Sequence, residues 1–339
     1  MRKLIIPIIL LLGLVYIFVN IAEVQEVAET LKRGELGFII LAFGVQLLWS
    51  LNVAASYHMV YHAVGLEEKM GKLFVLVLAA NFVNVVAPSG GVGGIAVFIS
   101  EARRQGYSSA RVTVSGALVV LFDYIAFLFV LFFGLIVLFR RNNLTMTEII
   151  PSIILLVVAV VLGTLIYLGI HSESALAKAL AWMAHLVNRF MWIFIHREYL
   201  SEQRAYSFAH EASSGLHRLR RKPDDLLLPF ALGLSSKALL ILILCLVMVA
   251  FKVPFSVGTL IGGFSIAYLF LIVSPTPAGI GVVEGAMTLG LTSLNITLGA
   301  ATVVTLAYRG ITFWVPLLLG FIAIRWLDRK EGQALSHEG

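Results

Sequence analysis

The feature that most constrains this chain is a series of apolar runs, each long enough to cross a lipid bilayer as a helix. About 30 Å of hydrocarbon needs roughly 20 residues at about 1.5 Å per residue. Six uninterrupted runs of about this length occur at 4–20, 36–63, 111–139, 151–170, 226–251 and 297–325. Of 339 residues, 60% are hydrophobic and 13% are charged, against about 25% charged in soluble proteins. The sequence therefore predicts an all-α polytopic membrane protein.

Two further apolar runs, 72–100 and 256–290, are interrupted by proline and glycine. Proline ends a helix because it lacks an N–H and clashes with the preceding turn, whereas glycine permits a tight reversal. We expect each run to form a re-entrant helical hairpin, which gives about eight membrane segments; two full spans are the alternative. The predicted turn residues are Pro88, Gly90, Gly91, Gly93 and Gly94 in the first run, and Pro275, Pro277, Gly279 and Gly281 in the second.

Basic residues indicate the orientation, because Lys and Arg accumulate on the cytoplasmic side. With hairpins, the N-terminal MRK, the LHRLRRK cluster at 216–222 and the RWLDRK cluster at 325–330 all lie inside, so both termini are cytoplasmic. Arg140 and Arg141 then lie outside. With two full spans this pair moves inside and the ARRQG sequence at 102–106 moves outside. We interpret 4–20 as an uncleaved first helix, since no small-x-small cleavage site follows it.

The longest polar segment, 171–222, holds eight Lys or Arg residues against four Glu. Apolar residues recur within it at helical spacing, which predicts an amphipathic helix along the cytoplasmic membrane surface. These residues are Leu176, Leu180, Met183, Val187, Phe190 and Phe194. We expect the basic face of the segment to contact anionic lipid headgroups, or to serve only as a topological anchor.

The order of span, interrupted run and span occurs twice, at 36–139 and 226–325. The Gly91–Gly93 segment of the first copy aligns with Gly279–Gly281 of the second. Under the hairpin topology the two copies have opposite orientations, which makes an inverted repeat within a single transmembrane domain, 1–339. Secondary transporters commonly have this architecture, and their sites form where broken helices meet near the membrane midplane.

Two ionisable residues, Asp123 and Arg309, lie near the middle of predicted spans, at nearly equivalent positions in the two copies. A charge there costs at least about 2.5 kcal/mol. We therefore expect them in the protein interior, where they could face each other. The guanidinium of Arg309 suits a phosphate or carboxylate; the alternative is a structural pair with Asp123 or Glu284.

Other polar residues near the breaks complete the candidate site. Glu284 follows the second turn and is either a proton site or the partner of Arg309. Lys237 reaches a central cavity or extends to the membrane interface. Asn81 and Asn84 line a cavity or satisfy backbone groups freed by Pro88. The predicted substrate-binding residues are Arg309, Tyr308, Glu284, Asp123, Lys237 and Asn84, with an anion site at the backbone N–H groups after the second turn.

Several chemistries are not expected. His58 and His62 lie one helical turn apart, but no third ligand is nearby in sequence, so we predict no metal site. The GGVGG sequence at 90–94 is followed by no Walker lysine and preceded by no strand, so we predict no nucleotide site. Cys245, within an apolar run, is expected to be a buried, inert thiol. We predict no cofactor and no nucleic-acid partner.

Three stretches resemble a known family. PTPAGIGVVEGAM at 275–287 and AYRGITFWVPLLLG at 307–320 resemble the C-terminal signature of the lysylphosphatidylglycerol synthase transmembrane family, also described as flippase-like or UPF0104 membrane proteins. NVVAPSGGVGGIAVF at 84–98 resembles its first glycine-rich segment. The resemblance covers roughly 36–327 and implies a location in the cytoplasmic membrane of a prokaryote.

The resemblance also sets expectations about activity. In bifunctional relatives this membrane region is associated with moving a lipid between leaflets, and a separate soluble domain transfers the aminoacyl group. Because this chain ends at Gly339, we expect no synthase activity. Many relatives place a Glu directly after the double glycine and an Arg three positions later, whereas this chain has Ile95 and Phe98.

The leading hypothesis is a transporter, or flippase, that moves a phospholipid or isoprenoid phosphate with an anionic headgroup across the cytoplasmic membrane. Without a nucleotide site, an ion gradient or the lipid gradient would supply the energy. One alternative is a membrane scaffold or accessory protein in envelope lipid metabolism, with 171–222 recruiting a partner. The other is a lipid-modifying enzyme, although the chain lacks the H-x4-D and D-x-D patterns of such enzymes.

Overall fold

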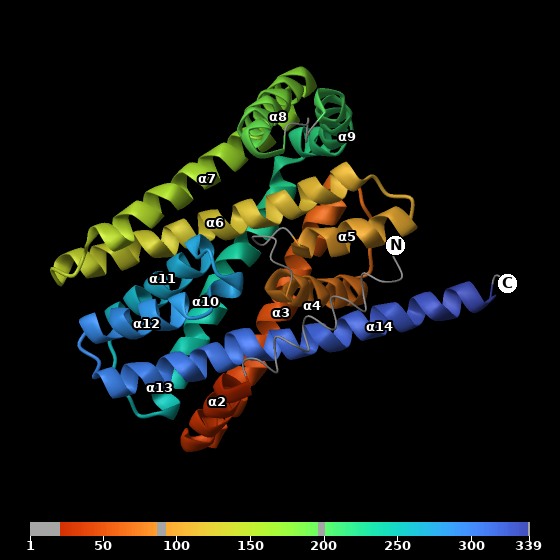
Figure 1. The fold of residues 1–339 in the computed structure, drawn as a ribbon. Helices are drawn as coiled ribbons and strands as arrows, with labels where there is room; N and C mark the ends of the chain where they lie inside the picture. Colours follow the sequence, from red (N-terminus) through yellow and green to blue (C-terminus); the bar gives the residue numbers. More distant parts are fainter. Residues whose placement is uncertain (1–20, 87–92, 196–200, 338–339) are drawn as a thin grey trace.

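The computed structural model describes residues 21–86, 93–195 and 201–337, and the chain is helical through most of these ranges (Figure 1). The predicted span at 4–20 and the turn residues Pro88, Gly90 and Gly91 lie outside the described residues. The helical elements are α2 (Ile21–Arg33), α3 (Leu36–Val64), α4 (Met70–Val86), α5 (Gly93–Arg104), α6 (Ser109–Arg140), α7 (Met146–His171), α8 (Glu173–Ile195), α9 (Glu202–Arg221), η1 (Pro223–Leu226), α10 (Leu227–Ala250), α11 (Val257–Val273), η2 (Pro277–Gly279), α12 (Val282–Ser293), α13 (Leu298–Arg309), η3 (Gly310–Trp314) and α14 (Val315–His337).

Within the described residues, five helical stretches are long and apolar enough to cross a bilayer: Leu36–Val64, Ser109–Arg140, Met146–His171, Asp224–Ala250 and Leu298–Leu327. They confirm five of the six predicted spans to within a few residues. Large apolar side chains on their outer faces, such as Phe129 and Phe139 of α6, are exposed, as expected for helices surrounded by lipid. The chain is a multi-pass membrane protein.

Each interrupted run contains two helices, α4 and α5 in the first segment and α11 and α12 in the second, and in both a helix of 17 residues precedes one of 12 residues. The shorter helices extend only about 18 Å, less than the hydrocarbon thickness. In the first segment, Gln105 after α5 donates to Glu68 before α4 at 2.5 Å. In the second, Arg141 donates to Ser256 before α11 at 3.1 Å and to the carbonyl of Leu294 after α12 at 3.0 Å.

The two segments therefore begin and end at opposite ends of α6. Arg103, near the end of α5, donates to Ser109 at the start of α6 at 3.0 Å. Arg141, which bridges both ends of the second segment, directly follows α6. Figure 1 shows this separation, with α4 and α5 beside the N-terminal half of α6 and with α11 and α12 beside its C-terminal half.

Glycine permits the closest helix crossings. An added methyl group would overlap the hydroxyl of Ser265 on α11 if placed at Gly134 of α6, and the backbone oxygen of Leu78 on α4 if placed at Gly320 of α14. The helix α4 thus packs on α14, and α11 packs on α6. Small residues allow such close approach between membrane helices. Between these crossings, α3 and α10 run antiparallel, with the N–H of Glu35 donating to the carbonyl of Ala250 at 2.9 Å.

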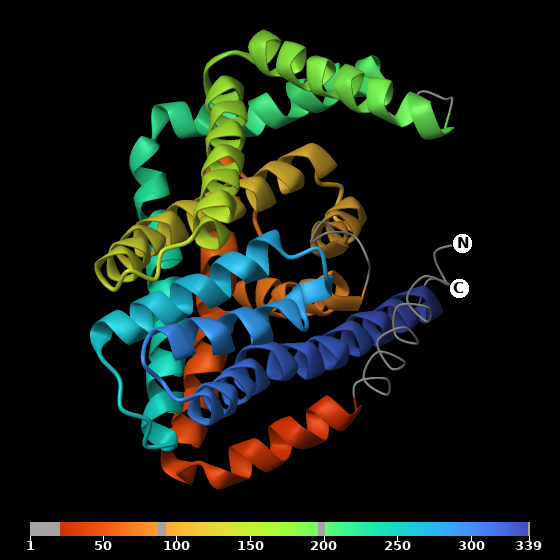
Figure 2. The ribbon, with the colours of Figure 1, turned by 60° about the vertical axis from the view of Figure 1, so that its left-hand side comes forward.

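The polar segment 171–222 contains two helices, α8 and α9, which pack together across one end of the molecule (Figure 2). The predicted amphipathic stripe lies on α8: Leu176 is buried, whereas Met183 and Val187 are exposed; the side chains of Phe190 and Phe194 lie outside the described set. Sequence analysis did not predict α9 as a separate helix. It is joined to the start of α6 by a hydrogen bond from Ser108 to Glu211 at 2.5 Å.

Candidate functional site

A polar cavity of about 530 Å³ lies where the second turn meets the centre of the bundle. A smaller cavity of about 250 Å³ shares four of its lining residues, Trp49, Asn81, Asn84 and Tyr124. The larger cavity is lined by Arg309, and the smaller by Asp123. The two cavities are therefore neighbours, with Arg309 in the wall of one and Asp123 in the wall of the other.

Arg309 lies in the wall of the larger cavity and is only 4% exposed. Its Nε donates to Glu284 Oε1 at 2.5 Å, and its Nη2 donates to the carbonyl of Ala278 at 3.0 Å. The guanidinium also stacks on Phe313, 4.6 Å from the ring centroid. Ala278 has a left-handed backbone, with φ of 50°, which is costly for a residue with a Cβ. Arg309 thus stabilises the strained turn as well as presenting a cation.

The chain makes a π turn directly after Arg309, at Gly310–Trp314. Pro316 explains it, because proline lacks an N–H and its ring would clash with the carbonyl four residues earlier, at Thr312. The hydroxyl of Thr312 donates to the carbonyl of Tyr308 at 2.8 Å and lines the larger cavity. Sequence analysis did not predict this turn, although Pro316 inside an apolar helix was a visible signal for it. Such turns are frequent at functional sites.

Asp123, Lys237 and Tyr268 form a buried polar cluster that joins α6, α10 and α11. Lys237 Nζ donates to Asp123 Oδ1 and to the Tyr268 hydroxyl, both at 2.5 Å, and that hydroxyl donates to Asp123 Oδ2 at 2.8 Å. The side chain of Lys237 is 1% exposed and that of Asp123 is 30% exposed. Lys237 therefore neither extends to the membrane interface nor lines the two cavities in the described structure; it lies behind Asp123. Sequence analysis missed Tyr268, which lies in an apolar helix.

The two charges singled out from the sequence are both described, and they do not pair with each other. Arg309 pairs with Glu284, and Asp123 pairs with Lys237. Equivalent positions in two copies do not bring the side chains together, because each charge has an opposite charge closer on a neighbouring helix. Each buried cation is matched by one carboxylate, as burial of charge requires.

The two asparagines before the first turn line both cavities. Asn84 Oδ1 accepts a hydrogen bond from the backbone N–H of Gly94 at 2.6 Å, so it caps the start of α5. A Cβ at Gly94 would lie 2.7 Å from the Asn84 side chain, which explains the glycine. The Nδ2 group of Asn81 is buried and has no hydrogen-bond partner within the described ranges. It is therefore a buried donor in the wall of both cavities without a partner among the described residues.

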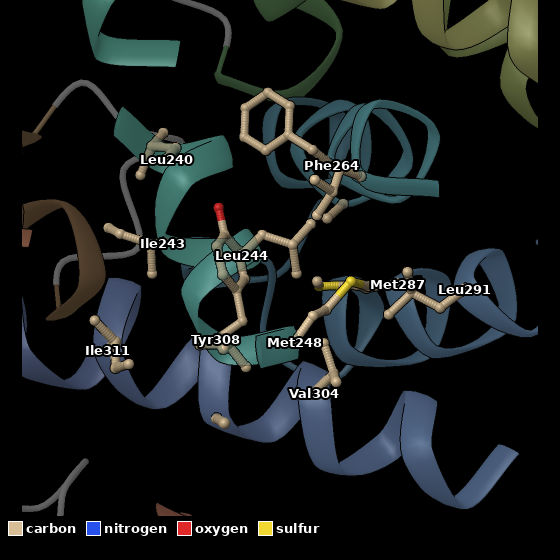
Figure 3. Close-up of a cluster of buried hydrophobic side chains, with 14 of the residues drawn as sticks. Leu240, Ile243, Leu244, Met248, Phe264, Met287, Leu291, Val304, Tyr308 and Ile311 are labelled. Carbon is tan, nitrogen blue, oxygen red and sulfur yellow. The ribbon is translucent and has the colours of Figure 1, made fainter. Parts of the chain in front are cut away.

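Tyr308 lies in a different environment from its neighbour Arg309. It is buried in an apolar cluster of both halves, and Figure 3 shows its ring extending from α13 toward Leu240, Ile243 and Leu244 of α10. Among the described residues, it is not part of the lining of either cavity. The structure gives Tyr308 a packing role.

The second turn has the backbone that the sequence predicts. Gly279 and Gly281 adopt positive φ angles of 74° and 76°, which glycine alone tolerates without strain. Pro275 and Pro277 line the larger cavity. Gly93 and Gly94 begin α5. Glu284 lies in the first turn of α12, so its carboxylate occupies the helix end where we expected an anion to bind.

The residues considered for other chemistry are placed as follows. His58 Nδ1 lies 3.0 Å from the carbonyl of Glu68. The described residues contain no group of three or more His, Cys, Asp or Glu side chains arranged to hold a metal ion. Cys245 is a partly buried thiol packed against the core.

Comparison with known proteins places the chain among membrane proteins. The family described as lysylphosphatidylglycerol synthase TM region matches residues 4–320. Similar proteins include UPF0104 membrane proteins of Methanothermobacter thermautotrophicus (21% identity; 91% of each chain), Methanocaldococcus jannaschii (24% identity; 96% of this chain, 97% of the relative) and Pyrococcus horikoshii (25% identity; 92% of this chain, 93% of the relative). The chain belongs to the lysylphosphatidylglycerol synthase transmembrane-region family.

Proposed function

We propose that this protein is a flippase-like transporter that moves a phosphate-bearing lipid across the cytoplasmic membrane. The headgroup occupies the central cavity while the hydrocarbon tails stay in the bilayer. The observation that carries the proposal is a polar cavity of about 530 Å³, with a guanidinium in its wall, inside a bundle of apolar helices. An ionisable residue at membrane depth usually marks a substrate or ion pathway.

The lining of the larger cavity suits a phosphate group. A guanidinium offers five N–H donors in a fork that matches phosphate oxygens, and two nitrogens of Arg309 have protein partners. Asn81 Nδ2 adds a donor without a partner in the described structure. The volume of about 530 Å³ lies within the range of small-molecule sites, about 300–1,000 Å³. A headgroup fits this space, whereas a complete lipid with its tails requires the bilayer.

The arrangement of helices supports alternating access in an inverted repeat. In both halves, α3–α6 and α10–α14, a long helix, a 17-residue helix, a 12-residue helix and a second long stretch follow one another. The segment of α4 and α5 begins and ends near the start of α6, and the segment of α11 and α12 begins and ends near the end of α6. Gly134 and Gly320 lie at equivalent helix crossings. Gly134 follows Asp123 at the same separation along the sequence as Gly320 follows Arg309. We infer two re-entrant hairpins that enter from opposite sides, with about eight segments including 4–20.

We place α8 and α9 on the cytoplasmic surface, together with both termini. Four arginines or lysines, Arg218, Arg220, Arg221 and Lys222, end α9, consistent with the positive-inside rule. The exposed apolar residues Trp182, Met183, Leu186 and Val187 of α8 suit insertion at the level of the headgroups. The basic residues then contact anionic lipids. We assign no transferase activity to this membrane region.

Reconstitution in liposomes tests the proposal. Fluorescent anionic, zwitterionic and isoprenoid-phosphate lipids are followed by reduction of the outer-leaflet dye, with and without a proton gradient. We expect the anionic lipids to move between leaflets in the presence of the native protein, and we expect this movement to be lost with Arg309→Ala. Arg140→Ala, which removes an exposed arginine at the end of α6, is the matched control and should leave movement intact.

Two outcomes would contradict the transporter assignment. If no lipid changes leaflet while the purified protein keeps its helical content, or if Arg309→Ala moves anionic lipids at the native rate, the transporter assignment is wrong. Conversion of a labelled lipid into a new product would favour the lipid-modifying enzyme instead.

A further inference from the structure

Glu284 occupies the position on Arg309 that a phosphate oxygen would take. Its Oε1 accepts from Arg309 Nε at 2.5 Å. Its second oxygen, Oε2, is buried and has no hydrogen-bond partner among the residues that the structure describes. The side chain is 17% exposed. A carboxylate with one oxygen satisfied by a cation and the other unsatisfied is poorly stabilised if that cation acquires a second anion.

An anionic headgroup at Arg309 would create that situation. The pair of Arg309 and Glu284 carries no net charge, so an added phosphate leaves the site with an excess negative charge at low dielectric. A nearby like charge favours the protonated form of a carboxyl group, and an uncompensated buried charge is strongly unfavourable. Arginine keeps its proton under all these conditions, and Glu284 is the carboxylate in contact with its guanidinium.

We propose that an anionic headgroup and one proton bind together, with the proton on the carboxyl group of Glu284; this inference rests on the proposed transport function. The exchange balances: the carboxylate gains a proton and becomes neutral, the phosphate supplies the negative charge opposite Arg309, and the net charge of the site is unchanged. Movement of the lipid then carries a proton with it, which couples transport to the proton gradient.

The surroundings favour Glu284 over the other buried carboxylate. The titratable or charged groups on the helices packed against α12 are Tyr268 of α11 and Tyr308 and Arg309 of α13. Asp123 is held by Lys237, which is fully buried and lies outside the lining of both described cavities. A phosphate cannot replace Asp123 there, so protonation of Asp123 would leave the lysine without a counter-ion. Arg309 lines the larger cavity, where a phosphate can reach its guanidinium, whereas Glu284 contacts Nε of that guanidinium and is not among the described residues that line the cavity.

Calorimetric titration of the full-length protein in detergent tests the proposal. The probes are dioctanoylphosphatidylglycerol, glycerophosphoglycerol as the same phosphodiester without tails, and dioctanoylglycerol as a neutral lipid. Measurements in buffers of different ionisation enthalpy give the number of protons taken up on binding. We expect about one proton per phosphatidylglycerol, and an affinity that falls by up to about tenfold per pH unit as the pH rises.

Glu284→Gln mimics the protonated acid, so its binding should take up no proton and should not depend on pH. Glu202→Gln, at an exposed position in the first turn of α9, is the matched control and should behave like the native protein. If Glu284→Gln does not fold, binding of phosphatidylglycerol by the native protein without proton uptake still overturns the proposal. Equal proton uptake with glycerophosphoglycerol would support the linkage and identify a phosphodiester without tails as a ligand.

Binding of phosphatidylglycerol without proton uptake would overturn this inference and leave the transport assignment intact. An unchanged pH dependence in Glu284→Gln would also overturn it, since another group would then take the proton. Absence of binding by every probe at every pH, together with absence of lipid movement in liposomes, would overturn both proposals.

Discussion

The buried pair of Asp123 and Lys237 leads to a prediction about two single substitutions. Removal of either partner breaks the same 2.5 Å contact, so a count of interactions would give the two variants equal effects. The structure predicts unequal effects because the partner that remains differs. Asp123→Ala leaves a lysine side chain that is 1% exposed, whereas Lys237→Met leaves a carboxylate that is 30% exposed and lines a cavity.

The magnitudes follow from these exposures. A buried charge that loses its partner costs about 3–5 kcal/mol, and we expect Asp123→Ala to lose this amount of unfolding free energy. Lys237→Met leaves Asp123 with the hydroxyl of Tyr268 at 2.8 Å and with access to the cavity, so the expected cost is about 1–3 kcal/mol. The double variant removes both charges. It should be more stable than Asp123→Ala, because apolar replacement of a buried ion pair is often neutral.

Equilibrium unfolding in mixed detergent micelles, followed by circular dichroism, measures these differences for the native protein and the three variants. Each variant is compared at the same detergent and protein concentration. A larger loss for Lys237→Met than for Asp123→Ala, or a double variant as unstable as the sum of the single changes, would refute the reasoning.

Two further predictions concern packing and pH. Gly320→Ala places a methyl group against a backbone oxygen of α4, whereas Gly299→Ala meets no atom within 4 Å; we expect the first to cost about 1–3 kcal/mol of unfolding free energy and the second to be near neutral in the same assay. Burial alone would raise the pKa of the Glu101 carboxyl, but Lys72 and neighbouring donors lower it below the usual value of 4.5. Its stabilising contribution is therefore present above about pH 4.5 and is lost as the pH falls through the lower folded-state pKa. Glu101→Gln should remove this acid dependence from unfolding curves, and an unchanged curve would contradict the assignment.

Local chemistry allowed much of the fold to be predicted from the sequence. In lipid each spanning segment must satisfy its own backbone, so a long apolar run can only be a helix. The five described spans are therefore where the composition places them. The second turn was also predictable, since Gly279 and Gly281 supply positive φ angles that other residues reach only with strain.

The charge partners required the tertiary structure. The sequence indicated that Arg309 and Asp123 lie inside, because a lone charge in lipid is unfavourable. It left Asp123 and Glu284 as alternative partners of Arg309, of which the structure has Glu284, and it did not indicate that Lys237 pairs with Asp123. Spacing along a helix determines which residues share its face, but it does not determine which helix lies opposite that face. The same reason applies to Tyr268, whose role depends on where α11 crosses α6 and α10.

The sequence by itself thus determined the secondary structure of the spans, the backbone of the second turn and the interior position of Asp123 and Arg309. Each of these features follows from the solvent around a short segment. Only the tertiary structure decided the pairing of those residues, the packing role of Tyr308 and the two cavities lined by Arg309 and by Asp123. These features depend on how helices distant in sequence cross, and close crossings such as that of Gly320 with α4 are settled by the packing of the whole bundle.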